Sequence, residues 1–267
     1  MENEPPRVGL IGFGEAGSTF ARAGHWQGRC SGWDILPGRR AAMADCGVLA
    51  GSGAAETIAG ADIVLSLVTA DSALAAAREY GRSLDPGAIW CDMNSVSPET
   101  KRLAAETIEA GDGHYVDVAV MAPVDPAGLN VPLLLAGPMA AEAERLLDAL
   151  GFANTRVVGS EVGRASAIKM IRSVMVKGLE ALTWECAAGA EAAGVFDEVM
   201  ASLDASEKAF GWAGKVAYNR ERMETHGARR AAEMEEAAKT LLDLGVEPVM
   251  TRGTVVLQRS AAKKKLG

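Results

Sequence analysis

The fold of this chain is decided by a glycine-rich stretch near its N-terminus, Val8-Gly-Leu-Ile-Gly12-Phe-Gly14-Glu-Ala-Gly17. The apolar residues before the glycines predict a buried strand, and Glu15 to Gly24 predicts a helix. In that setting the first glycine permits a tight turn, the second lets the backbone approach a pyrophosphate, and the third lets helix and strand pack closely. The start of the helix favours bound phosphate. We therefore predict a dinucleotide site that includes Gly12, Phe13, Gly14, Glu15 and Ala16.

An acidic residue, Asp34, ends the second predicted strand at the spacing of about 20 residues that dinucleotide-binding turns show. A carboxylate there accepts hydrogen bonds from the adenosine ribose and repels the additional phosphate of NADP, so we expect NAD as the cofactor. Arg39 and Arg40 lie close by and keep NADP as an alternative. Other interpretations are a turn without a ligand, a site for S-adenosylmethionine or FAD, and a turn-forming role for Asp34 alone.

Strands and helices alternate through the first 160 residues. Strands are predicted at 8–11, 30–34, 63–68, 88–93, 115–120, 133–136 and 156–158, and helices at 15–24, 37–46, 71–80, 98–110 and 139–150. Several strands are apolar throughout, which is typical of parallel strands covered on both faces. The pattern predicts an α/β Rossmann domain over residues 1–160, with a doubly wound, mostly parallel sheet.

Residues at the ends of two predicted strands extend the predicted site, because ligands of such sheets bind at the carboxyl ends of the strands. We expect Val68, Thr69 and Asn94 to contact the cofactor. We expect Ser95 to contact the substrate or the nicotinamide. The alternative for Ser95 is a place in the N-cap region of the helix that Pro98 begins.

The second part of the chain, residues 161–267, has only helical patterns and predicts an all-α domain. Ser160 is predicted to cap a long helix that runs to Ala193, and a further helix is predicted at 225–244. An apolar stripe on the long helix is typical of a core or of an oligomer seam, and we expect a homodimer. The stripe consists of Ile168, Ile171, Met175, Leu179, Leu182 and Cys186.

The bulk composition narrows the partners. The formal net charge of -8 argues against nucleic acid and against anionic membrane surfaces. The acidic N-terminus is unlike a signal peptide, and the sequence has no apolar run long enough to span a membrane. The four cysteines lack metal-ligand spacing. We interpret them as reduced, structural residues of a cytoplasmic chain.

The motifs resemble those of the β-hydroxyacid dehydrogenase superfamily, which includes 3-hydroxyisobutyrate and 6-phosphogluconate dehydrogenases. The matching segments are Gly9 to Gly17, Trp33-Asp34-Ile35 and Asp92-Met-Asn-Ser95-Val-Ser-Pro98. Val120-Met-Ala-Pro123 and the segment 226–236 are typical of a branch with a C-terminal domain of unknown function. The resemblance implies a Rossmann domain, a helical domain that often forms a dimer, and hydride transfer to or from a small hydroxy acid.

The resemblance also implies a catalytic lysine. The family pattern Gly-x-Gly-x-x-x-Lys matches Gly163 to Lys169, except that Ala165 replaces the second glycine. Lys169 is therefore the predicted general acid/base, because oxidation of an alcohol needs a base at the hydroxyl while hydride leaves the carbon. The alternative is an ordinary solvated lysine on a helix.

The substrate positions depart from the family pattern. Met121-Ala122-Pro123 stands where Ser-Gly-Gly is usual, and Arg172-Ser173 stands where two asparagines are usual. His226 and Arg230 share a helix face, and with Arg172 they predict a site for a small anionic hydroxy or oxo acid, reached across the cleft or from a partner subunit. The alternative there is a solvated face with pairs such as Arg229 and Glu233. Two competing functions stay open, an imine reductase on the same scaffold and a non-catalytic dinucleotide sensor.

Overall fold

The computed structural model describes residues 4–206 and 211–264. Its internal contacts divide the chain into two units, one ending at Arg172 and the other beginning at Ser173. The predicted domain boundary after residue 160 precedes the long helix α7, Arg164–Ala193, and the division between the units lies inside that helix. Each unit is described by itself.

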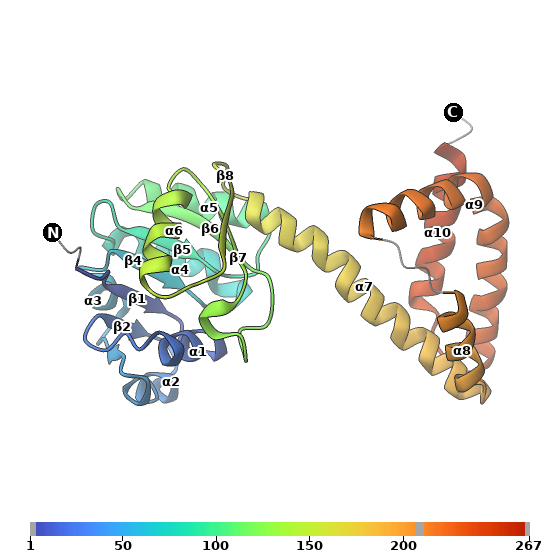
Figure 1. The fold of residues 1–267 in the computed structure, drawn as a ribbon, viewed down its shortest axis with the longest axis horizontal. Helices are drawn as coiled ribbons and strands as arrows, with labels where there is room; N and C mark the ends of the chain where they lie inside the picture. Colours follow the sequence, from blue (N-terminus) through green and yellow to red (C-terminus); the bar gives the residue numbers. More distant parts are fainter. Residues whose placement is uncertain (1–3, 207–210, 265–267) are drawn as a thin grey trace. The chain divides into compact units, whose positions relative to one another are not determined.

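The first unit contains a single eight-stranded sheet with helices on both faces (Figure 1). Its strands are β1 Val8–Ile11, β2 Cys30–Trp33, β3 Leu49–Ala50, β4 Ile63–Ser66, β5 Ile89–Asp92, β6 His114–Val120, β7 Leu133–Ala136 and β8 Thr155–Gly159. They lie in the order β3-β2-β1-β4-β5-β6-β7-β8, and all neighbours are parallel except β6 and β7. The predicted doubly wound, mostly parallel Rossmann sheet is confirmed.

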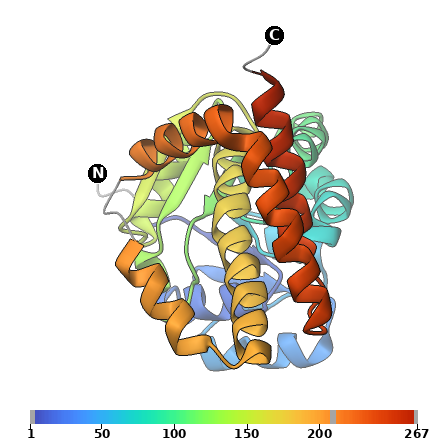
Figure 2. The same cartoon turned by 90° about the vertical axis from the view of Figure 1, so that its right-hand side faces the viewer.

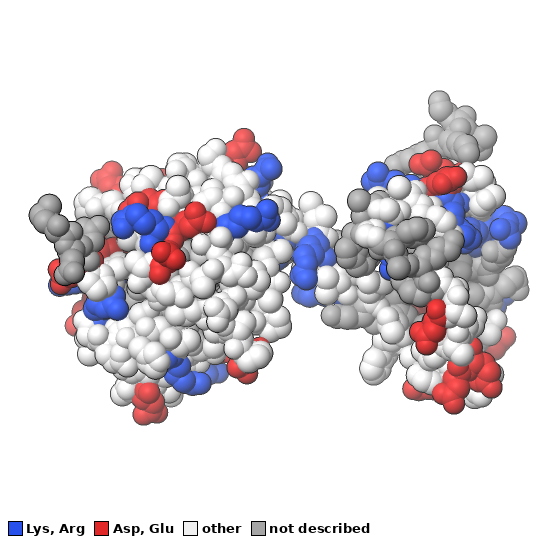
Figure 3. Space-filling model, in the orientation of Figure 1, with Lys and Arg blue, Asp and Glu red and all other residues white. Residues whose placement is uncertain are grey.

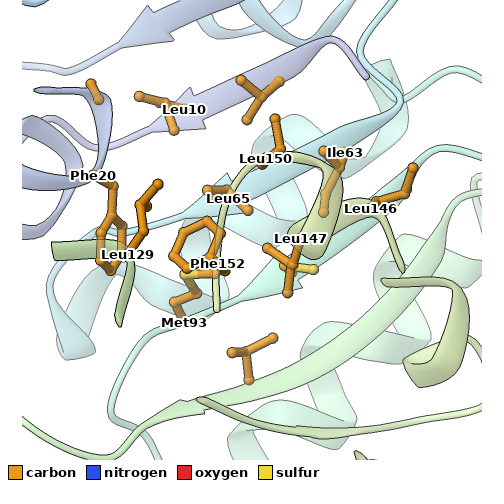
Figure 4. Close-up of a cluster of buried hydrophobic side chains, with 14 of the residues drawn as sticks. Leu10, Phe20, Ile63, Leu65, Met93, Leu129, Leu146, Leu147, Leu150 and Phe152 are labelled. Carbon is orange, nitrogen blue, oxygen red and sulfur yellow. The ribbon is translucent and has the colours of Figure 1, made fainter. Parts of the chain in front are cut away.

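Several strands are apolar throughout because their alternate residues enter two cores. Ile63 and Leu65 of β4 belong to the core cluster that also holds Phe20 and Phe152 (Figure 4). Val64 belongs to a second cluster on the opposite face. The helices of this unit are α1 Glu15–Gly24, α2 Pro37–Ala41, α3 Ala54–Ile58, α4 Ala73–Tyr80, α5 Pro98–Glu109 and α6 Ala140–Ala149.

The cysteines are free, as the sequence predicted. Cys30 and Cys91 are buried in strands of the first core. Burial raises the pKa of the Cys30 thiol to about 12 and raises the pKa of the Cys91 thiol further. Both thiols therefore stay neutral at ordinary pH and pack as small apolar groups.

One local prediction in the first unit is wrong, and two short elements were not predicted. The helix predicted at 37–46 ends at Ala41, and a short 3-10 turn follows. The chain leaves the helix where Met43 enters the core, fully buried beside Gly32. The sequence does not predict β3 and α3, because they are only two and five residues long, too short to show a periodic pattern.

The second unit is helical, as predicted. Beyond α7 it contains α8 Phe196–Ser206, α9 Trp212–Asp243 and α10 Val249–Lys264. The helices α9 and α10 pack side by side (Figure 2). The prediction that a helix begins at residue 225 is wrong, because α9 already begins at Trp212. At Gly227 of this helix a side chain would strike the Gln258 carbonyl of α10. None of the helices in residues 4–206 and 211–264 has the length and apolarity needed to cross a bilayer.

Charge is spread unevenly over the surface that Figure 3 shows. Acidic and basic side chains are interspersed on this face of the first unit. In the second unit acidic side chains gather near α8, whose first turn carries Asp197 and Glu198.

Candidate dinucleotide site and catalytic pair

The glycine-rich turn after β1 has a backbone shape that requires glycine at two positions. Gly12 has a φ of 95°, and a Cβ there would lie 2.6 Å from the Leu67 carbonyl oxygen. A Cβ at Gly17 would lie 2.6 Å from the Gly12 carbonyl oxygen, so α1 packs closely on the turn. A Cβ at Gly14 would meet nothing within 4 Å. The turn is thus tightly packed on its inner side and open at Gly14.

The start of α1 suits an anion. Gly14 is its N-cap residue, and no side chain of the described residues caps the helix there. The N–H groups of the first turn, which includes Glu15 and Ala16, can therefore bind a phosphate. Phe13 holds the turn in place: its side chain is buried in the core and its N–H group donates to Asp34.

Asp34 ties the glycine-rich turn to the end of β2. Its Oδ2 accepts a hydrogen bond from the Phe13 N–H group at 2.7 Å, and its Oδ1 accepts one from the Leu36 N–H group at 2.8 Å. Each carboxylate oxygen keeps further acceptor capacity for a ribose hydroxyl. Arg40 donates to the Asp34 carbonyl oxygen at 2.6 Å and stacks on Trp33 at 4.6 Å. These contacts give Asp34 a structural role in addition to the predicted one.

The ends of β4 and β5 lie next to this turn in the sheet, because β4 is the neighbour of β1 and β5 is the neighbour of β4. Val68 is half-buried and Thr69 is exposed after β4. Asn94 is buried after β5, and its Nδ2 donates to Ser66 Oγ at 3.0 Å. Its Oδ1 has no partner among the described residues. A buried acceptor at a strand end is available to a ligand donor.

The structure brings together two residues that the sequence predicted separately. Lys169 Nζ donates a hydrogen bond to Ser95 Oγ at 2.5 Å, although the residues are 74 positions apart. Ser95 is exposed and Lys169 is half-buried. An amine and a hydroxyl at this distance can hold and pass a proton, and Ser95 lies at the carboxyl end of β5, on the edge of the sheet that also carries the glycine-rich turn.

The first turn of α7 is anchored by a carboxylate from β6, and Lys169 lies in the next turn of this helix. Asp117 Oδ2 accepts hydrogen bonds from the Gly163 N–H group at 3.1 Å and from the Ser166 N–H group at 2.9 Å. The prediction that Ser160 caps this helix is wrong, because α7 begins at Arg164 and its cap comes from a distant strand. Ala165 is fully buried beside Met121, where the family pattern has glycine.

The remaining predicted substrate residues are not gathered into one place that the structure describes. Met121 is half-buried and Ala122 is exposed, both just beyond β6. Arg172 is exposed three residues after Lys169 on α7. Ser173, His226 and Arg230 belong to the second unit, so their part in a common site stays a prediction. The Glu233 side chain lies outside the described part of the chain.

Sequence reasoning missed the buried polar residues that lie behind Lys169 and Ser95. These are Asp92, Lys101, Asp117 and Ser166, all buried. A signal was present, because Asp117 interrupts an otherwise apolar strand and buried carboxylates need partners.

A separate surface hollow of about 480 Å³ lies at the opposite edge of the sheet. Its lining includes Asp62, Asp85 and His114, which precede or begin β4, β5 and β6. None of the predicted site residues lines it.

The fold and the glycine-rich turn define the class, a dinucleotide-binding protein of the oxidoreductase type. Residues 7–159 match the NAD binding domain of 6-phosphogluconate dehydrogenase, and the chain belongs to that family. Residues 190–261 match a domain of unknown function, DUF1932. The predicted resemblance, including the branch, is confirmed, and the chain carries an NAD-binding domain.

Three relatives cover nearly the whole chain. A Methanothermus fervidus protein, described as an uncharacterized 28.5 kDa protein, is 30% identical over 256 residues, which are 93% of this chain and 96% of that protein. A conserved hypothetical protein of Sinorhizobium meliloti is 38% identical, with a TM-score of 0.66 over 98% of this chain and 90% of the other. A protein of unknown function with structural similarity to 3-hydroxyacid dehydrogenases is 32% identical, with a TM-score of 0.64 over 97% and 98%.

More distant structures share the fold alone. An imine reductase from Myxococcus stipitatus, solved in complex with NADP+, is 21% identical, with a TM-score of 0.79 over 97% of this chain and 95% of the other. The same enzyme has a variant solved in complex with NAD+.

Proposed function

We propose that this protein is an NAD(P)-dependent oxidoreductase that transfers a hydride between the nicotinamide cofactor and a small hydroxy or oxo acid. The observation that carries the proposal is the 2.5 Å hydrogen bond between Lys169 and Ser95. It places an amine at the edge of the sheet where the dinucleotide-binding turn lies, which is where ligands of such sheets bind.

The residues present fit a dinucleotide. The open side of Gly14 and the uncapped start of α1 suit a pyrophosphate, and the Asp34 carboxylate suits the adenosine ribose. When bound, the nicotinamide supplies the hydride acceptor or donor. NAD is the proposed cofactor because Asp34 faces the turn, and because Arg40 is already engaged with Trp33 and the Asp34 carbonyl oxygen.

Lys169 is the proposed general acid/base. In the oxidative direction its neutral amine accepts the proton of the substrate hydroxyl, and in the reductive direction the ammonium returns that proton to the carbonyl oxygen. Ser95 holds the amine in place through its hydroxyl. Arg172, one helical turn further along α7, supplies positive charge for a substrate carboxylate. His226 and Arg230 are proposed to add to that charge.

An imine reductase is the second candidate, because solved imine reductases share this fold. A screen separates the candidates. The purified chain is offered oxo acids, hydroxy acids and cyclic imines with NAD(H) and NADP(H), and the nicotinamide absorbance is followed. We expect turnover of at least one hydroxy or oxo acid, with NAD(H) preferred. Turnover of imines alone supports the second candidate, and binding without any turnover supports a sensor. Failure to bind either dinucleotide contradicts all three.

We further propose that the chain forms a homodimer through α7. Along this helix Ile171 is 73% exposed and Trp184 is 78% exposed, and the predicted apolar stripe is largely exposed too. Apolar area of this kind is usually covered by a partner. We expect sedimentation to give the dimer mass, and Ile171→Lys to shift the equilibrium toward monomer while an exposed control such as Lys177→Ala does not. A monomer at micromolar concentration would contradict this proposal.

A further inference from the structure

A fully buried lysine lies between two buried carboxylates in the first unit. Lys101, on α5, is 0% exposed, and Asp92 on β5 and Asp117 on β6 are 1% and 0% exposed. The Lys101 Nζ lies 3.1 Å from Asp92 Oδ1 and 3.5 Å from Asp117 Oδ1, and it donates to the Asp92 carbonyl oxygen at 2.5 Å. Apolar residues of similar volume are often at least as stable as a buried ion pair, so stability alone is a weak reason for this arrangement.

One carboxylate leads to the catalytic lysine. Asp117 Oδ2 accepts hydrogen bonds from the Gly163 and Ser166 N–H groups and, at 3.1 Å, from the Ser166 hydroxyl. Ser166 precedes Lys169 by three residues on α7, which is about one helical turn. The position of Asp117 therefore fixes the start of α7 and, through it, the position of the Lys169 side chain.

The other carboxylate leads to Ser95. Asp92 Oδ1 accepts hydrogen bonds from the Asn94 N–H group at 2.9 Å and from Asn94 Nδ2 at 2.7 Å. Asn94 is bonded directly to Ser95 in the chain. Asp92 Oδ2 accepts a hydrogen bond from the Tyr115 hydroxyl at 2.7 Å, and burial raises the Tyr115 pKa well above its usual value, so the phenol stays a neutral donor.

We propose that Lys101 is a positioning residue for the Lys169–Ser95 pair. Its ammonium group contacts both carboxylates, and so links two sets of hydrogen bonds. One set runs from Asp117 to the start of α7, and the other runs from Asp92 to the loop that carries Ser95. Without this positive charge the two carboxylates repel each other, and the start of α7 moves away from the loop that carries Ser95. The effect on catalysis rests on the proposed function, whereas the contacts that join Lys101 to Asp92 and Asp117 lie entirely within the first unit.

The test uses Lys101→Met, which keeps the volume and removes the charge, and the milder Asp117→Asn, which keeps the shape of the carboxylate. Trp26→Phe is the matched control, because it removes another buried hydrogen bond of the same unit, from Trp26 Nε1 to the Leu150 carbonyl oxygen at 2.9 Å. Two readouts are taken on folded protein. The first is kcat together with the KM for the dinucleotide. The second is the acetylation rate of Lys169 by acetic anhydride, measured by peptide mapping against the other lysines.

We expect both network variants to lower kcat by roughly 10- to 100-fold with little change in the dinucleotide KM, because small misplacements of a catalytic group cost this much. We expect the Lys169 acetylation rate to change by several-fold in these variants and to stay unchanged in Trp26→Phe. If Lys101→Met does not fold, Asp117→Asn decides. A normal kcat and a normal acetylation rate in the folded variant would overturn the inference. If the wild-type chain shows no turnover, the acetylation rate still tests the link while the proposed function fails.

Discussion

Replacing Lys169 with alanine is expected to lower kcat by about 10²- to 10⁴-fold, the usual contribution of a positioned general acid or base. The dinucleotide affinity is expected to stay within about twofold, because the glycine-rich turn and Asp34 are untouched. The physical reason is the loss of the amine that donates to Ser95 Oγ at 2.5 Å and that is the proposed proton donor and acceptor. Steady-state kinetics with the best substrate of the screen, together with a fluorescence titration of the dinucleotide, measures both effects.

The matched control is Lys177→Ala, which removes an exposed lysine from the same helix. Its kcat is expected to equal that of the wild type. A normal kcat in Lys169→Ala would remove the proposed mechanism while leaving the dinucleotide site intact. A loss of dinucleotide binding in that variant would mean that Lys169 binds the cofactor and does not transfer the proton.

Gly12→Ala is expected to destabilise the protein by about 2–5 kcal/mol and to weaken dinucleotide binding at least about tenfold. The positive φ of 95° costs an alanine about 1–2 kcal/mol. A Cβ 2.6 Å from the Leu67 carbonyl oxygen forces the backbone to move, and such overpacking typically costs about 1–3 kcal/mol. Denaturant unfolding measures the stability, and calorimetric titration with NAD measures the affinity.

Gly14→Ala separates the two effects. Its added methyl group meets nothing within 4 Å, so the loss of stability is expected to be only about 1 kcal/mol, the usual cost of alanine at a helix N-cap. The same methyl group occupies the open side of the turn, and NAD affinity is expected to fall. Unchanged NAD affinity in Gly14→Ala would contradict the placement of the pyrophosphate at this turn.

Much of the fold could be predicted from sequence because its decisive signals are local. The strand, the glycines and the helix start between Val8 and Gly24 lie within one short stretch, and Gly17 is constrained by Gly12 within that stretch. The apolar strands showed that both faces of the sheet are covered. Local signals failed where a segment is very short, as in β3, and they missed the first part of α9, which begins at Trp212.

The sequence by itself determined the dinucleotide-binding half, its glycine geometry and, through a family resemblance, the identities of Lys169 and Ser95. Only the tertiary structure decided that these two side chains meet, where α7 begins, and that Lys101 lies buried between Asp92 and Asp117. The physical reason is the range of the interactions. A carboxylate that caps a helix 46 residues further along the chain interrupts its own strand but does not show which segment it caps, because its partners become neighbours only after the sheet has formed.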